Sequence, residues 1–213
     1  MSSESAASVY RLESPLLTSD PNSVANIGDV RVKHYHIDVT TQFQSQTFVG
    51  SVALTFRVVN PSGASRIALD VRDLAVKRAV FGGAQLPFEI TPSPLGQALT
   101  VSFPSPLSAA QGDLVLQIDF ETSPSASGLQ WLPPAQTSDK LAPYLFSQFQ
   151  AIHCRSFIPC QDTPTVKSTY SADVIVPSNL TALMSAISLS SSPVVCLFLL
   201  SFFSLFLFFL LFF

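Results

Sequence analysis

The chain has 213 residues, which allows one ordinary domain with short additions. Its net charge is −3 at neutral pH and only 12% of its residues are charged, so it lacks the basic surface that a nucleic-acid-binding protein needs. It has three cysteines, an odd number, and we find no secretory signal before them. These features predict reduced thiols and a cytoplasmic location.

The first 26 residues are rich in serine and contain no apolar run. They lack the basic start and apolar centre of a signal peptide, and their acidic residues argue against a transit sequence. We expect residues 1–26 to form a disordered leader.

A period-two alternation of apolar and polar residues begins at Val30. It is imperfect at first and clear in the next segment, 48–60, which is typical of a half-buried strand. Turns that contain proline or glycine, such as Gly82-Gly83, separate the later segments. Further short strands are predicted at residues 66–71, 74–81, 99–103 and 114–122. This spacing, with no convincing helical period, predicts an all-β fold with an antiparallel sandwich or saddle-shaped sheet over residues 27–187.

The stretch from Tyr144 to Ala186 carries most of the functional information. Two glutamines, Gln148 and Gln150, lie two residues apart among apolar residues, so an extended backbone would place both amides on one face. Neutral amides can hold a peptide backbone or an amine by hydrogen bonds, but they cannot act as acids or bases. From the residues alone, amides that only satisfy nearby backbone groups are the better interpretation.

Two prolines, Pro159 and Pro164, predict a rigid irregular loop around residues 160–162. Arg155 and Asp162 could form an ion pair that fixes this loop. Its cysteines have neither metal-site nor redox spacing, so we expect buried, inert thiols. A period-two run from Thr169 to Val176 predicts a half-buried strand after the loop.

The blocks PYLFSQ-x-QA-x-x-CR and PCQDTP-x-VK-x-TY (residues 143–170), together with LQWL (129–132) and ALMSA (182–186), resemble the N-terminal domain of the M1 zinc aminopeptidases, and within that family the leukotriene A-4 hydrolase branch. The resemblance implies the same β-structure. It also implies that Gln148, Gln150 and Ala151 bind substrate. It ends near Ala186, where the catalytic domain of the family should follow.

The family holds its catalytic zinc with an H-E-x-x-H motif and a distal glutamate. This motif is absent from the sequence, so we expect no catalytic residue, metal ligand or cofactor in this chain. The resemblance implies that the full-length relative is a zinc aminopeptidase and epoxide hydrolase acting on peptides. This chain would then be a truncated form, inactive alone, with the missing catalytic domain as its packing partner. His34 and His36 share a strand face and could chelate a metal weakly, although two polar surface residues are the simpler interpretation.

The last segment, residues 188–213, is a low-complexity tail of Phe, Leu and Ser. As a helix, Val194 to Phe213 would span about 30 Å, the thickness of a bilayer core, and would give membrane contact. No Lys, Arg, Trp or Tyr flanks it, which argues against an anchor. We favour read-through of a pyrimidine-rich tract, which encodes these residue types, because the resemblance ends where this composition begins. A membrane-tethered β-sandwich binding module is therefore the alternative to a truncated enzyme domain.

Overall fold

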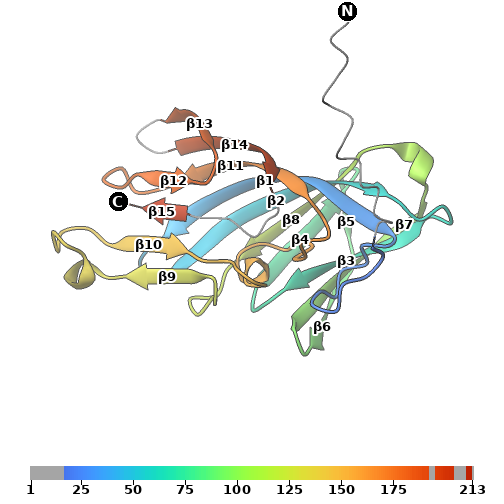
Figure 1. Cartoon of the computed structure of the whole chain (residues 1–213), viewed down its shortest axis with the longest axis horizontal. Helices are drawn as coiled ribbons and strands as arrows, with labels where there is room; N and C mark the ends of the chain where they lie inside the picture. The colour runs from blue at the N-terminus through green and yellow to red at the C-terminus, as the bar shows by residue number, and fades with distance from the viewer. Residues whose placement is uncertain (1–16, 192–194, 204–209, 213) are drawn as a thin grey trace, which may run out of the picture.

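The computed structural model describes residues 17–191, 195–203 and 210–212. Its largest sheet has eight strands in the order β13-β14-β11-β1-β2-β8-β4-β5 (Figure 1). The pair β1 and β11 is parallel, and the neighbouring pairs along the rest of the sheet are antiparallel. The strands of this sheet are β1 (Val30–Gln42), β2 (Thr47–Val58), β4 (Ala75–Phe81), β5 (Ala84–Leu86), β8 (Leu114–Glu121), β11 (Ser168–Ile175), β13 (Ile187–Ser191) and β14 (Val195–Phe203).

Two smaller sheets lie toward opposite ends of the large one (Figure 1). One has the strand order β3-β7-β6 and the other β12-β15-β10-β9. Buried side chains from all three sheets form one hydrophobic core. The strands are β3 (Ala64–Val71), β6 (Phe88–Ser93), β7 (Gly96–Leu107), β9 (Leu129–Leu132), β10 (Tyr144–Ser147), β12 (Ala182–Met184) and β15 (Leu210–Phe212), and the short 3₁₀ helices are η1 (Ala109–Gln111), η2 (Pro134–Gln136) and η3 (Cys154–Ser156).

The alternation predicted in the first two strands is confirmed. In β2 the apolar residues of one face are all buried, namely Val52, Leu54, Phe56 and Val58. In β1 the burial phase shifts between Val32 and Tyr35, because a bulge interrupts the pairing with β2 between Val32 and His34. The bulge explains why the sequence pattern of this strand is imperfect.

The all-β class is confirmed, but an entirely antiparallel arrangement is wrong. Strands β1 and β11 run parallel, with His34 opposite Thr169 and Thr40 opposite Ile175. A parallel pair needs a crossover connection, and here the whole chain between the two strands provides it. Periodicity within a strand shows which face is buried and carries no information on the direction of a partner so far away in the sequence.

The second part of the predicted leader is packed against the domain. Ala25 is buried in a cluster with Ile27 and Val166 of the domain, and the backbone N–H of Val24 donates to Asp70 over 2.8 Å. The disorder expected for residues 1–26 is therefore corrected for residues 17–26. The remaining residues of the expected leader, 1–16, lie outside the described residues.

The described part of the C-terminal tail is extended, in strands β14 and β15. Strand β14 pairs with β11, and β15 pairs with β10 and β12. Within the described ranges, we find no helix of the length and apolar character that a membrane crossing requires. Residues 194, 204–209 and 213 of the expected anchor lie outside those ranges.

Candidate substrate-binding site

The three predicted substrate-binding residues lie together directly after β10. Gln148, Gln150 and Ala151 are all exposed, and a cis peptide bond joins Gln150 to Ala151. The backbone N–H of Gln148 donates to the carbonyl oxygen of Gly128 over 2.9 Å. The backbone N–H of Gln150 lies 3.5 Å from the side-chain oxygen of Gln148. The structure thus presents two amide side chains on one short exposed segment, which we call the amide wall (residues 148–151).

The amide wall is anchored by Phe149, the residue between the two glutamines. Its side chain is only 1% exposed and stacks on Phe157, with ring centroids 5.4 Å apart and an interplanar angle of 15°. Phe157 in turn meets Phe48 of β2 edge to face at 5.2 Å. Because Phe149 points into the core, its two neighbours are directed to solvent.

Gly128 helps to hold the amide wall in place through its backbone. Its carbonyl oxygen accepts from Gln148, and its N–H donates to the Ser156 hydroxyl over 3.0 Å. A Cβ atom at this position would lie 2.5 Å from the Phe149 ring and 3.0 Å from the carbonyl oxygen of His153. Only glycine fits under this ring.

Replacing Gly128 with alanine should therefore push the Phe149 ring out of its place. We expect a loss of about 1–3 kcal/mol in the free energy of unfolding, as for other overpacked cores, measured by urea denaturation. A Gly82→Asn variant is the control, because a Cβ there meets no atom within 4 Å and asparagine tolerates its positive φ of 57°. Equal stability of the two variants would contradict the close fit under Phe149.

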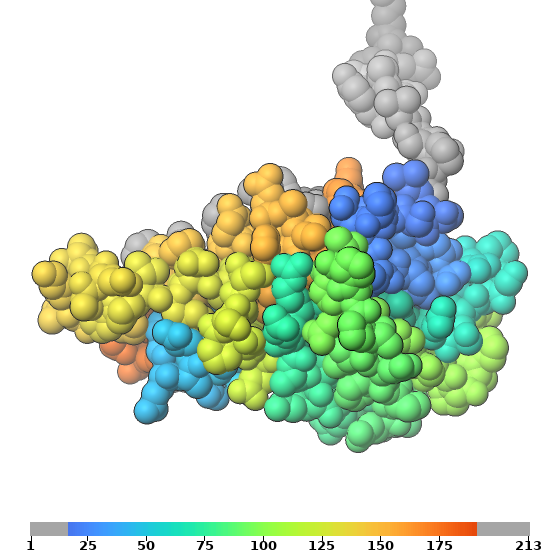
Figure 2. Space-filling model, turned by 90° about the horizontal axis from the view of Figure 1, so that it is seen from below, coloured from blue at the N-terminus to red at the C-terminus, as the bar shows by residue number. Residues whose placement is uncertain are grey.

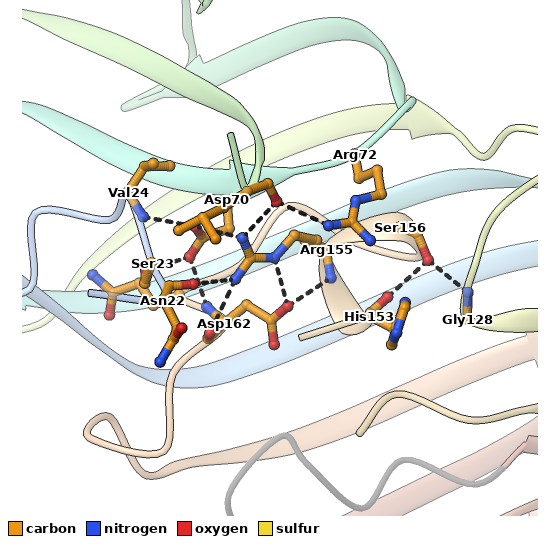
Figure 3. A network of polar contacts seen from close by, with 12 residues as sticks. Asn22, Ser23, Val24, Asp70, Arg72, Gly128, His153, Arg155, Ser156 and Asp162 are labelled. Carbon is orange, nitrogen blue, oxygen red and sulfur yellow. Dashed lines mark hydrogen bonds and ion pairs between the residues drawn. The ribbon is translucent and has the colours of Figure 1, made fainter. Parts of the chain in front are cut away.

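A buried ion-pair network holds the loop that follows the amide wall (Figure 3). The guanidinium of Arg155, 1% exposed, lies 2.9 Å from the Asp162 carboxylate and 3.4 Å from that of Asp70. The same guanidinium donates to the carbonyl oxygens of Asn22 and Leu95 over 2.8 and 2.9 Å. The predicted pairing of Arg155 with Asp162 is confirmed. Burial raises the pKa of the Asp162 carboxyl, although the ion pair with Arg155 opposes the shift.

Asp70 was not singled out in the sequence, yet it is completely buried at the centre of this network. Its carboxylate accepts from the N–H groups of Val24 and Asp162 over 2.8 and 3.0 Å, and from the Ser23 hydroxyl. One sequence feature could have identified Asp70: it is an acid within the apolar run I-A-L-D-V of β3. An acid buried in such a strand requires a partner.

Gln161 joins the same loop to the large sheet. Its side-chain oxygen accepts from the N–H of Val32 over 2.9 Å, and its side-chain nitrogen donates to the carbonyl oxygen of Val30 over 2.8 Å. The pairing of β1 with β11 starts at His34. The Gln161 side chain therefore supplies hydrogen bonds to the backbone of Val30 and Val32, which precede the paired residues.

The two loop cysteines, Cys154 and Cys160, are buried and free, as predicted. Burial raises the pKa of both thiols, most strongly that of Cys160. A thiol that resists ionisation is a poor nucleophile and a poor metal ligand. In the part of the chain that the structure describes, no group of three or more His, Cys, Asp or Glu side chains could hold a metal ion.

Two hollows flank the loop between β9 and β10, which projects at one end of the molecule (Figure 2). One, of about 320 Å³, lies between Leu132 and the segment 136–144. The other, of about 280 Å³, is lined by Phe43, Trp131 and prolines. The amide wall lines neither of these two hollows.

The profile of the Peptidase M1 N-terminal domain matches residues 31–194. The chain belongs to the M1 peptidase family. Leukotriene A-4 hydrolase of Xenopus laevis is 44% identical to this M1 domain over 171 residues, which is 79% of the chain and 28% of the relative. Leucine aminopeptidase 2 of Chaetomium globosum is 37% identical over 177 residues, which is 82% of the chain and 28% of the relative.

The solved structure of native yeast LTA4 hydrolase has the same fold as this M1 domain. It superposes with a TM-score of 0.82 at 29% identity, over 91% of this chain and 30% of that one. The resemblance seen in the sequence is confirmed, and the chain spans less than a third of the relatives' length.

Proposed function

We propose that this domain forms one wall of the substrate site of a zinc aminopeptidase and epoxide hydrolase of the leukotriene A-4 hydrolase type. In this proposal Gln148 and Gln150 hold the backbone or the terminal amine of a peptide by hydrogen bonds, and Ala151 lies beside it. The observation that carries the proposal is the form of the amide wall: two exposed amides flank one buried ring that fixes them. A segment held in this way loses little conformational freedom when it binds.

The catalytic zinc does not fit the residues described here. In the described ranges no three potential ligands come together, and the sequence has no H-E-x-x-H motif. We therefore assign zinc binding and hydrolysis to a catalytic domain, and we expect this chain to be inactive alone. Exposed apolar side chains offer a surface on which such a partner could pack, namely Leu141, Leu183, Ile187 and Leu189.

A chimaera tests this role of the amide wall. Residues 17–186 would replace the corresponding domain of the Xenopus relative, and hydrolysis of an aminoacyl chromogenic substrate would be measured. Gln150→Ala should lower kcat/KM by roughly 10- to 150-fold, the equivalent of about 1.5–3 kcal/mol for a lost hydrogen bond to a charged group.

Gln85→Ala is the matched control, since Gln85 is an exposed glutamine on β5 in the same domain. It should leave kcat/KM unchanged. If Gln148→Ala and Gln150→Ala in the chimaera also had no effect, the amide wall would not contact substrate. Turnover by the unmodified 213-residue chain alone would overturn its assignment as an inactive domain.

A further inference from the structure

Two histidines of β1 and three polar residues of β11 form a continuous polar ladder on one face of the parallel pair. The Nδ1 of His34 lies 2.7 Å from the Thr169 hydroxyl, and its Nε2 lies 3.0 Å from the Ser171 hydroxyl. The Nδ1 of His36 lies 2.8 Å from the same Ser171 oxygen. The remaining nitrogen of His36, Nε2, lies 3.5 Å from the carboxylate of Asp173.

The proton positions on His34 follow from its neighbours. The Thr169 hydroxyl donates to the carbonyl oxygen of Lys33 over 3.3 Å, so it accepts from the Nδ1–H of His34. A neutral His34 then has a lone pair on Nε2, directed at the Ser171 oxygen.

The same reasoning applies to His36. The Asp173 carboxylate can only accept hydrogen bonds, so it favours a proton on the Nε2 that faces it. A neutral His36 then has its lone pair on Nδ1, which is also directed at Ser171. Because Ser171 has one hydroxyl hydrogen, it can serve only one of the two converging lone pairs.

We propose that His34 Nε2 and His36 Nδ1 form a binding site for one divalent transition-metal ion, with Cu²⁺ bound most tightly. Imidazole nitrogens suit copper, nickel and zinc, and Cu²⁺ gives the highest affinity in the series. Rotation of the Ser171 side chain opens the position on which both nitrogens converge. Water completes the coordination, since the His36 side chain remains 43% exposed.

The groups around the two histidines are arranged as in metal sites. Ligating histidines usually donate their second N–H to a carboxylate or another acceptor, which fixes the ring and strengthens the ligand. Here the Asp173 carboxylate lies 3.5 Å from the Nε2 of His36, and the Thr169 hydroxyl accepts from His34. The carboxylate faces the far side of the imidazole, away from the ion, so the site has two direct side-chain ligands.

The neighbouring strands bring no positive charge opposite the histidines. On β2 the residues opposite His34 and His36 are Thr55 and Ala53. Asp38 stands opposite Asp173 in the register and adds a second negative charge. Strand β14, on the other side of β11, has no ionisable basic residue in its sequence. The site is independent of the amide wall and of the catalytic zinc of the family.

Titration of the purified full-length chain with Cu²⁺ tests the site, by calorimetry and electron paramagnetic resonance. We expect one saturable ion with two nitrogen donors in its spectrum. His36→Gln and His34→Gln should each remove one nitrogen donor. Asp173→Asn should weaken binding by about tenfold through the loss of ring orientation. Ser171→Ala should still bind, because it removes only the competing hydroxyl.

His153→Gln is the matched control, because the sequence has three histidines and His153 is the one outside the ladder. It should bind Cu²⁺ like the unchanged chain. Thermal unfolding without metal shows whether each variant is folded. The proposal is overturned if the chain shows no saturable Cu²⁺ binding, if the two ladder variants keep both nitrogen donors, or if Ser171→Ala abolishes binding in the folded protein.

Discussion

Replacing Arg155 with alanine is expected to lower the free energy of unfolding by about 3–5 kcal/mol, the usual cost of removing one partner of a buried ion pair. The guanidinium is almost completely buried and contacts two buried carboxylates, Asp70 and Asp162. Without it, these carboxylates would remain in the core without a cation. The carbonyl oxygens of Asn22 and Leu95 would also lose a donor.

Urea denaturation at neutral pH measures this loss. Arg78→Ala is the control, because Arg78 forms an ion pair with Asp119 on the surface, where its side chain is 50% exposed. Surface pairs of this kind contribute about 0–1 kcal/mol. Similar losses in the two variants would mean that the buried network contributes no more than an exposed pair.

The loss caused by Arg155→Ala should depend on pH. Burial already raises the pKa of Asp162, and removing the opposing guanidinium should raise it further. A carboxyl whose pKa is higher in the folded state contributes stability below its unfolded pKa of about 4 and loses it as pH rises through the folded value. The deficit of the variant relative to the unchanged chain should therefore be smallest near pH 4 and grow toward neutral pH.

The sequence predicted best those features that depend on neighbouring residues. The buried face of β2 follows from strict alternation, and the Gly82-Gly83 turn follows from the positive φ that only glycine adopts easily, at 57° and 82°. Arg155 and Asp162 are seven residues apart across a proline-bounded loop, so their pairing could also be predicted from the sequence.

Contacts between distant segments could not be predicted in this way. The carboxylate of Asp70 lies 46 residues from its Val24 partner, and Gln161 lies more than 120 residues from Val32. The bulge that shifts the phase of β1 was visible only as an imperfect pattern. Gly128 gave no signal either, because its importance comes from the Phe149 ring, which approaches it through the fold.

The same long-range packing sets the second large effect, which we expect for Phe157→Ala. The free energy of unfolding should fall by about 3–5 kcal/mol, the cost of truncating a buried phenylalanine and leaving a cavity. Phe157 is 1% exposed and fills the space between Phe149, under the amide wall, and Phe48 of the large sheet. Urea denaturation measures the loss. Leu141→Ala is the control, since that side chain is 83% exposed and should change stability little.

Phe157→Ala should also loosen the amide wall before the whole domain unfolds. Without the stacked ring, Phe149 loses an aromatic contact, and the backbone N–H of Gln148 should exchange with solvent faster. Strands β2 and β8 lie in the middle of the large sheet. The exchange rates of their backbone amides should change only as far as the free energy of global unfolding changes. If Gln148 followed the central strands instead, the amide wall would be part of the global folding unit. The positions of its two glutamines would then depend on the folding of the whole sheet. The Phe149–Phe157 stack would make no separate contribution to the local stability of the amide wall.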